Sequence, residues 1–165
     1  MENKLILRSR AFMEGERIPL QYTGRGEDVS PPLMMENIHP RAKSIAITMD
    51  DLDIPFIKCY NHWIIWNIPI CNSIPEGIPF GKKIDVPFSA VQGLAYGKHG
   101  YRGPKPPRMI KNRHRYVFTA YVLDCMCELP AESKKKQWWR AVDGHILQQA
   151  SLCGSFCNAD QYSED

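Results

Sequence analysis

Prolines and glycines are spread along the whole chain and leave few uninterrupted stretches that could form a long helix. The chain has 13 prolines and 11 glycines in 165 residues. Proline lacks a backbone donor and glycine is conformationally free, so both residues tend to break regular structure. Short segments between such residues suit strands joined by turns. We therefore expect a mainly β protein, and the length predicts one domain over residues 1–165 with a core of its own.

Five stretches rich in apolar, β-branched or aromatic residues are predicted to be strands. Residues 63–68 are almost all apolar and stop at Pro69, which is typical of a strand buried on both faces. Residues 116–123 are dense in aromatic and β-branched side chains. The predicted strands are 5–7, 44–49, 63–68, 116–123 and 152–156.

A helix is expected in the C-terminal half of the chain. An apolar residue recurs every four positions between Glu132 and Gln149, as on one face of a helix. Gly144 interrupts this pattern, and glycine inside a helix costs about 1 kcal/mol relative to alanine. The sequence therefore allows one helix or two short ones. The apolar residues are Trp138, Val142, Ile146 and Ala150.

The charge pattern does not favour nucleic acid or membrane insertion. The net charge is only +3, and the one dense basic run, Lys134–Lys136, is more typical of the solvated face of a helix. No segment approaches the ~20 apolar residues of a transmembrane helix. The apolar stretch near the N-terminus is too short for the core of a signal peptide. We expect a cytoplasmic protein without nucleic-acid binding or integral membrane association.

Six cysteines are expected to be thiols, because disulfides are rare in the cytoplasm. The pairs Cys125/Cys127 and Cys153/Cys157 could supply four sulfur ligands, but neither has the C-x-x-C spacing of a zinc knuckle. Cys125 and Cys127 end a strand-like run, where cysteine usually serves as a small buried apolar residue. The sequence therefore predicts structural thiols, no metal and no other cofactor.

The first candidate for a binding site is His62, which follows a cluster of acids at the end of the strand 44–49. Asp50, Asp51 and Asp53 form this cluster. A carboxylate beside an imidazole raises its pKa and favours imidazolium, which binds anions. The alternatives are an aspartate-rich turn and a histidine that only fills the core.

The second candidate is the glycine- and proline-rich loop 100–107 with the strand that follows it. A loop of this composition is stiff and can present its remaining N–H groups to an anion. His114 and Tyr116 are two residues apart, so on a strand their side chains share a face. The alternatives are a rigid turn and a half-buried polar pair at the start of a strand.

These segments together resemble the phosphatidylethanolamine-binding protein family, which includes the Raf kinase inhibitor protein, and especially its short prokaryotic branch. The most specific matches are Asp-x-Asp-x-Pro at 51–55, His-Trp at 62–63 and His-Arg-Tyr at 114–116. The matching blocks in chain order are residues 30–33, 42–55, 62–69 with 74–77, 100–118 and 144–154.

The resemblance implies antiparallel β-sheets in a Greek-key arrangement, with one or two helices in the C-terminal half. It also implies that the two histidine neighbourhoods meet in one surface pocket for phosphate-type anions, with Tyr60 near the mouth and Lys105 beside it. The ligand-binding residues carried over by position are Asp51, Asp53, His62, Pro106, Pro107, His114 and Tyr116.

The function expected from these features is non-catalytic binding of a small anion in a surface pocket. This binding could also regulate a partner protein. One alternative is a hydrolase or transferase that uses the histidines and the carboxylate as acid and base. However, the sequence has no nucleophile elbow, P-loop or metal-binding histidine pair, so an enzyme is not predicted. Another alternative is an interaction protein that inhibits a kinase or a protease. By analogy with the prokaryotic branch, a homodimer is expected.

Overall fold

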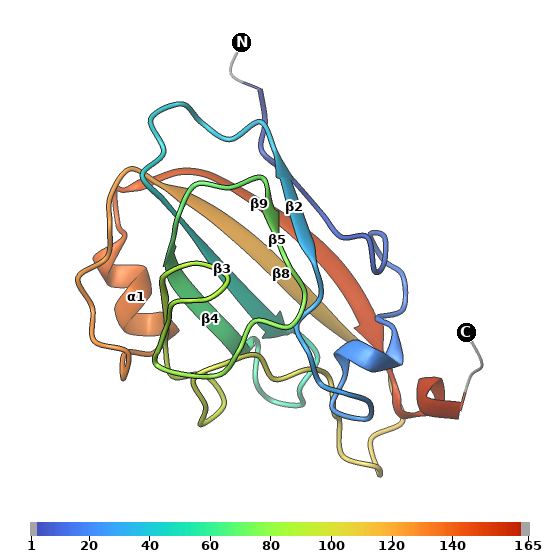
Figure 1. Ribbon diagram of the computed structural model, residues 1–165. Helices are drawn as coiled ribbons and strands as arrows, with labels where there is room; N and C mark the ends of the chain where they lie inside the picture. Colours follow the sequence, from blue (N-terminus) through green and yellow to red (C-terminus); the bar gives the residue numbers. More distant parts are fainter. Residues whose placement is uncertain (1–2, 163–165) are drawn as a thin grey trace.

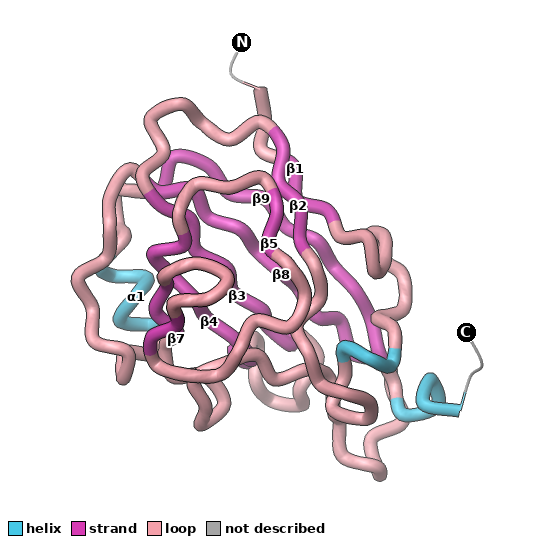
Figure 2. The backbone as a smooth tube through the Cα atoms, in the orientation of Figure 1, coloured by secondary structure: helices cyan, strands magenta, loops and turns pink. Residues whose placement is uncertain are grey.

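The computed structural model describes residues 3–162 and has a mainly β fold with two antiparallel sheets (Figures 1 and 2). The larger sheet has the strand order β6-β7-β4-β3-β8-β9, and the smaller one has the order β1-β2-β5. This confirms the predicted fold class. The strands are β1 (Ile6–Arg8), β2 (Leu33–Glu36), β3 (Ser44–Asp51), β4 (Tyr60–Ile68), β5 (Ser73–Ile74), β6 (Lys83–Ile84), β7 (Ala90–Gln92), β8 (His114–Leu123) and β9 (Ile146–Phe156).

The large sheet contains a Greek-key connection. Strands β3, β4 and β7 lie side by side, and β8 then returns to the free edge of β3. This is the arrangement in which a fourth strand lies beside the first of three. As a result, residues far apart in the sequence meet at the end of β3, where Asp51 pairs with Tyr60 of β4 and Tyr116 of β8.

The central strands are buried on both faces because each face of the large sheet is covered. On β3, Ile45 and Ile47 pack in the core that the small sheet covers. Ala46 points to the opposite face and packs against Trp138 of helix α1 (Lys135–Ala141). Strand β4 is also buried on both faces, as its nearly continuous apolar run predicts.

The predicted helix over residues 132–149 is correct only in its first half. Helix α1 ends at Ala141, and residues from Ile146 onward form β9, which pairs with β8 along its length. Gly144 has a φ of +76°, a conformation that glycine adopts easily, and it allows the chain to turn between the two elements. A spacing of four fits a helix, but it is also a multiple of the two-residue repeat of a strand.

Two short 3₁₀ helices, Leu20–Tyr22 and Asn158–Tyr162, complete the regular structure of the described residues. All six cysteines are free thiols. Cys125 follows β8 whereas Cys153 lies on β9. Within residues 3–162, no helix has the length and apolar character needed to span a membrane.

Candidate functional site

The pleat of β3 sends neighbouring aspartates to opposite faces of the sheet. Asp50 faces helix α1, where its carboxylate accepts hydrogen bonds from Lys135 Nζ at 2.7 Å and Asn61 Nδ2 at 3.1 Å. Asp51 faces the other way and contacts His114 of β8, with 2.8 Å between Asp51 Oδ2 and His114 Nδ1. The alternation of a strand therefore assigns only one of the two acids to the candidate site.

Asp53 lies just beyond β3 and fixes the turn that carries Asp51. Its backbone N–H donates to Asp51 Oδ1 at 2.9 Å. Its own carboxylate accepts hydrogen bonds from the backbone and guanidinium of Arg115, at 2.7 to 3.0 Å. Hydrogen bonding to Arg115 lowers the pKa of Asp53, so the carboxylate stays ionised. Asp53 thus supports the candidate site indirectly, through its hydrogen bonds with Asp51 and Arg115.

A β-bulge in β4 directs His62 toward the same end of the sheet. Met49 of β3 pairs with Trp63 and Asp50 pairs with Asn61, so His62 is the extra residue opposite the step between them. A bulge of this kind places two successive side chains on one side of the strand. Without the bulge, the side chains of β4 would alternate strictly between the two faces of the sheet. Because Trp63 is buried in the core between the sheets, the side chain of residue 62 would then point toward helix α1.

The imidazole of His62 is buried and has one nitrogen bound by the protein. Its Nδ1 lies 2.8 Å from the carbonyl oxygen of Arg102, and because a carbonyl can only accept, Nδ1 carries the hydrogen. Its Nε2 is buried without a hydrogen-bond partner among residues 3–162. Burial lowers the pKa of His62 below its usual 6.5, which leaves Nε2 as an unprotonated acceptor at neutral pH.

His114 has the same arrangement with a carboxylate in place of the carbonyl. Asp51 accepts the hydrogen of His114 Nδ1, and His114 Nε2 is buried without a partner in the described part of the chain. The ring of Tyr116 stacks on that of His114, with 6.2 Å between ring centroids, and meets the ring of His62 edge-on at 5.6 Å. Burial raises the pKa of Tyr116 well above its usual value, so its phenol stays neutral.

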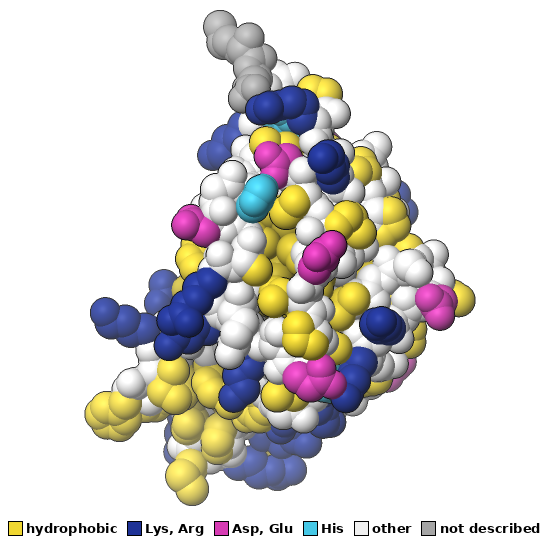
Figure 3. Space-filling model, turned by 90° about the vertical axis from the view of Figure 1, so that its left-hand side faces the viewer, with side chains coloured by type: hydrophobic (Ala, Val, Ile, Leu, Met, Phe, Trp, Pro, Cys, Tyr) yellow, Lys and Arg dark blue, Asp and Glu magenta, His cyan; other side chains and the backbone are white. Residues whose placement is uncertain are grey.

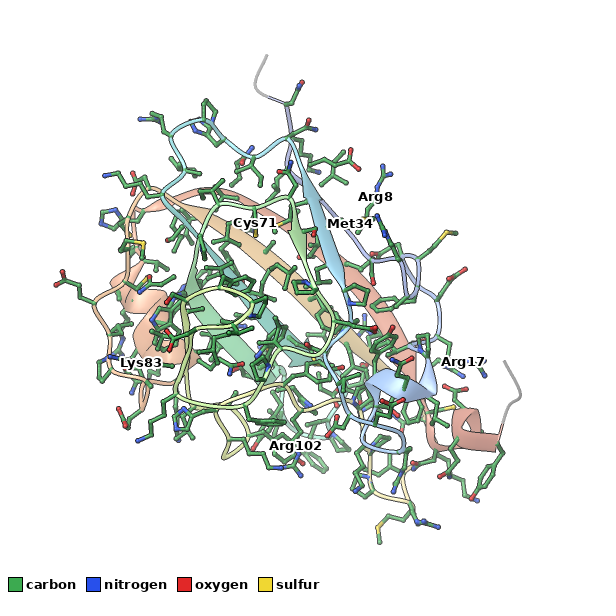
Figure 4. All side chains as sticks on the ribbon, in the orientation of Figure 1. Arg8, Arg17, Met34, Cys71, Lys83 and Arg102 are labelled. Atoms are coloured by element: carbon green, nitrogen blue, oxygen red, sulfur yellow. The ribbon has the colours of Figure 1, made fainter. Side chains whose placement is uncertain are left out.

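Two further tyrosines surround His62. The ring centroid of Tyr60 lies 6.1 Å from that of His62, and the centroid of Tyr96 lies 5.0 Å away. Arg102 covers Tyr96, with its guanidinium carbon 3.6 Å from the ring centroid (Figure 4 labels Arg102). Tyr96 has a φ of +50°, which a bulky residue rarely adopts. Tyr96 lies in a loop without a recognisable motif, so its sequence context gives no sign of its place beside His62.

The glycine- and proline-rich loop 100–107 was expected to offer free N–H groups to an anion. In the structure it contributes to the site in another way. The N–H of Gly103 donates to Asp28 Oδ1 at 2.7 Å, and the loop instead offers the carbonyl of Arg102 to His62. The carbonyl of the buried Pro106 accepts a hydrogen bond from Arg25.

Two other predicted residues of this loop lie at the protein surface. The exposed Pro107 accepts a hydrogen bond from Asn158, and the exposed Lys105 lies against Gly24. Contact of Pro106, Pro107 and Lys105 with a ligand stays a prediction.

The fold and the two buried imidazoles that pack against Tyr116 define a small β-sheet protein with a polar site at one end of its central strands. The family model described as "Phosphatidylethanolamine-binding protein" matches residues 8–157. The chain therefore belongs to the phosphatidylethanolamine-binding protein family.

Prokaryotic relatives match over nearly the whole chain. A UPF0098 protein of Pyrococcus horikoshii is 40% identical over 157 residues, which cover 94% of this chain and 78% of the relative. One from Methanothermobacter thermautotrophicus is 39% identical over 152 residues, which cover 91% and 97% of the two chains.

Solved structures show the same fold. A putative phosphatidylethanolamine-binding protein homolog from Chlamydia trachomatis has a TM-score of 0.82 and 34% identity, with 99% of each chain covered. The YbcL protein of Escherichia coli also has a TM-score of 0.82, with 93% of this chain and 98% of YbcL covered. Its identity of 22% makes it a comparison of fold alone.

Proposed function

We propose that this protein binds a small phosphate-type anion between His62 and His114 without transforming it. One observation carries the proposal: both imidazoles are buried, both have Nδ1 held by the protein, and both leave Nε2 without a partner among residues 3–162. A buried polar atom without a hydrogen bond costs about 1–3 kcal/mol. Two such atoms in histidines that both pack against Tyr116 are understandable when a ligand completes their hydrogen bonds.

A phosphate group has the chemistry to satisfy both nitrogens. A phosphomonoester has a second pKa of about 6, so near neutral pH it can carry one proton or none. A protonated phosphate oxygen can donate to an unprotonated Nε2, and a protonated Nε2 can donate to a phosphate oxygen. A tetrahedral group with several oxygens can therefore meet both imidazoles in whichever protonation state they adopt.

The groups gathered here are better suited to holding an anion than to attacking one. The ring of Tyr116 packs against both histidines, and its raised pKa keeps its hydroxyl as a neutral phenol. A neutral phenol is a weak nucleophile but a good hydrogen-bond donor. This supports a binding role, as does the name of the matching family.

Nuclear magnetic resonance of the histidine side chains tests the proposal. Inorganic phosphate at millimolar concentration should shift the imidazole signals of His62 and His114. His145 is a matched control, because it is exposed and its Nδ1 pairs with Asp124 at 2.8 Å. Unchanged signals of His62 and His114, or equal shifts at His145, would refute binding at this site.

We further propose that the protein acts in the cytoplasm as a homodimer and that ligand binding regulates a partner protein. The family resemblance supports these statements. Sedimentation of the purified chain tests the dimer, and a purely monomeric species would contradict it. Copurification of a partner with the wild type, but not with His62→Ala, tests the regulatory role.

A further inference from the structure

A hollow in the surface lies beside two tyrosines, Tyr60 and Tyr96, whose rings pack against His62. It has a volume of about 280 Å³ and lies between helix α1 and the strand-and-loop segments around residues 60 and 96. Tyr60 and Tyr96 form part of its wall, and both rings also pack against His62. The hollow and the proposed anion site therefore share these two rings. Its lining residues are Tyr60, Asn61, Leu94, Ala95, Tyr96, Gly97 and Lys134–Lys136.

The charge of this hollow is positive. Lys135 is held by Asp50, with 2.7 Å between Lys135 Nζ and Asp50 Oδ2. Burial alone would lower the pKa of Lys135, but attraction to and hydrogen bonding with Asp50 outweigh it and raise the pKa, so this pair is ionised and neutral overall. Lys134 and Lys136 are exposed on the same wall and add two positive charges. In the view from the α1 side, Lys and Arg side chains gather toward the lower part of the molecule (Figure 3).

Asn61, which lines the hollow, has a buried acceptor atom without a donor among the described residues. Asn61 Nδ2 donates to the Met49 and Trp63 carbonyls and to Asp50, at 2.9 to 3.2 Å, and these three acceptors fix the orientation of the amide. The Asn61 Oδ1 atom is buried and has no hydrogen-bond partner within the described residues. A hydroxyl or ammonium group of a ligand in the hollow would satisfy it.

We propose that this hollow holds the rest of the ligand whose phosphate lies between His62 and His114. The inference rests on the proposed function and names the ligand class: a small phosphomonoester that also carries an O–H or N–H donor and a second acidic group. The donor serves Asn61 Oδ1, and the carboxylate or second phosphate lies against Lys134 and Lys136. A ligand with only one acidic group leaves the two lysines without an anion.

Two commercially available ligands test whether the site recognises a second acidic group, because they differ in that group alone. O-phosphoserine and phosphoethanolamine have the same phosphate and ammonium groups, and only phosphoserine has a carboxylate. Partly exposed ion pairs contribute up to about 1 kcal/mol, so we expect wild-type protein to bind phosphoserine about fivefold more tightly. Isothermal titration calorimetry at low salt measures both dissociation constants.

The double variant Lys134→Gln/Lys136→Gln should bring the two dissociation constants close together. A matched control is Lys43→Gln/Lys83→Gln, which changes the net charge equally with exposed lysines outside the hollow (Figure 4 labels Lys83). The control should keep the preference for phosphoserine. Unfolding temperatures of both variants confirm that they are folded.

The outcomes separate this inference from the proposed function. Equal binding of the two ligands by the wild type, or an equal loss of preference in both double variants, would overturn the second acidic subsite while anion binding stands. If neither ligand shifts the signals of His62 and His114, the proposed function fails and the subsite fails with it. Binding of phosphopeptides alone would replace the small ligand by a protein partner and would also overturn the inference.

Discussion

Anion binding at the histidine pair should take up protons and strengthen as the pH falls. In the free protein, burial lowers the pKa of His62, so its Nε2 is unprotonated near neutral pH. A fully ionised phosphate brings only acceptors to this nitrogen. A stable complex therefore needs a proton between them, taken from the solvent by His62 or retained by the phosphate itself. In either case the complex binds more protons than the separate partners.

The size of this effect follows from proton linkage. For each proton taken up, the logarithm of the dissociation constant changes by at most one per pH unit, or about 1.4 kcal/mol. One proton between pH 7.5 and 5.5 gives up to about a hundredfold tighter binding. The gain ends when the pH falls below the pKa of the free group that supplies the proton, either His62 or the phosphate with its second pKa of about 6, because the proton is then already present.

The stability of the unliganded protein should respond to pH in the opposite direction. Because the pKa of His62 is lowered on folding, its neutral form contributes stability that is present above the unfolded value of about 6.5 and is lost as the pH falls through the folded value. Acidification should therefore weaken the free protein while it strengthens the complex. This opposite response distinguishes specific binding from a general change in the fold.

Calorimetric titration with phenyl phosphate in two buffers of different ionisation enthalpy measures the protons taken up. We expect an uptake approaching one per ligand at pH 7, and a reduced uptake in His62→Gln. Replacement of the exposed His145 by glutamine should leave the uptake unchanged. A dissociation constant that is independent of pH, with no proton uptake, would refute the reasoning.

Three other predictions concern stability and can be checked by denaturant unfolding. Lys135→Met should destabilise the protein by about 2 kcal/mol, because it leaves the buried Asp50 without its cation, and Asp50→Asn in the same chain should restore part of the loss. Tyr96→Gly should be about 1 kcal/mol more stable than Tyr96→Ala, the reverse of the usual order, because residue 96 has a positive φ. Gly93→Ala should destabilise by about 2 kcal/mol or more, because its Cβ would lie 2.4 Å from the ring of Trp66; stability equal to the wild type would contradict the packing.

The sequence predicted the main strands and the two histidine neighbourhoods because these depend on local pattern. The apolar run at 63–68 and the aromatic run at 116–123 correspond to β4 and β8. The shared face of His114 and Tyr116 follows from alternation along β8, and both side chains are buried and stacked. The short strands β2, β5, β6 and β7 were not predicted because two to four residues carry no detectable periodicity.

The features that required the structure depend on pairing between distant segments. The bulge at His62 is a mismatch between β3 and β4, which no single segment can reveal. The closeness of Tyr96 to His62 depends on how the loop after β7 folds back over the sheet. The end of α1 was misjudged because Ile146 continues the helical spacing while pairing with Leu123 of β8, and a long neighbouring strand prevailed over local periodicity.

The histidines that have only structural contacts show why the pair at 62 and 114 calls for a ligand. His99 and His145 also have Nδ1 bound to an oxygen, at 3.0 and 2.8 Å, but neither Nε2 is among the buried nitrogens without partners. If His62 and His114 only filled the core, an apolar side chain of similar size would remove the penalty of about 1–3 kcal/mol for each unsatisfied nitrogen. The strained backbone of Tyr96 beside them adds a further cost of about 1–3 kcal/mol. Two buried nitrogens without partners and one strained loop residue thus lie near one end of β3, β4 and β8, and a bound anion would account for the two nitrogens directly.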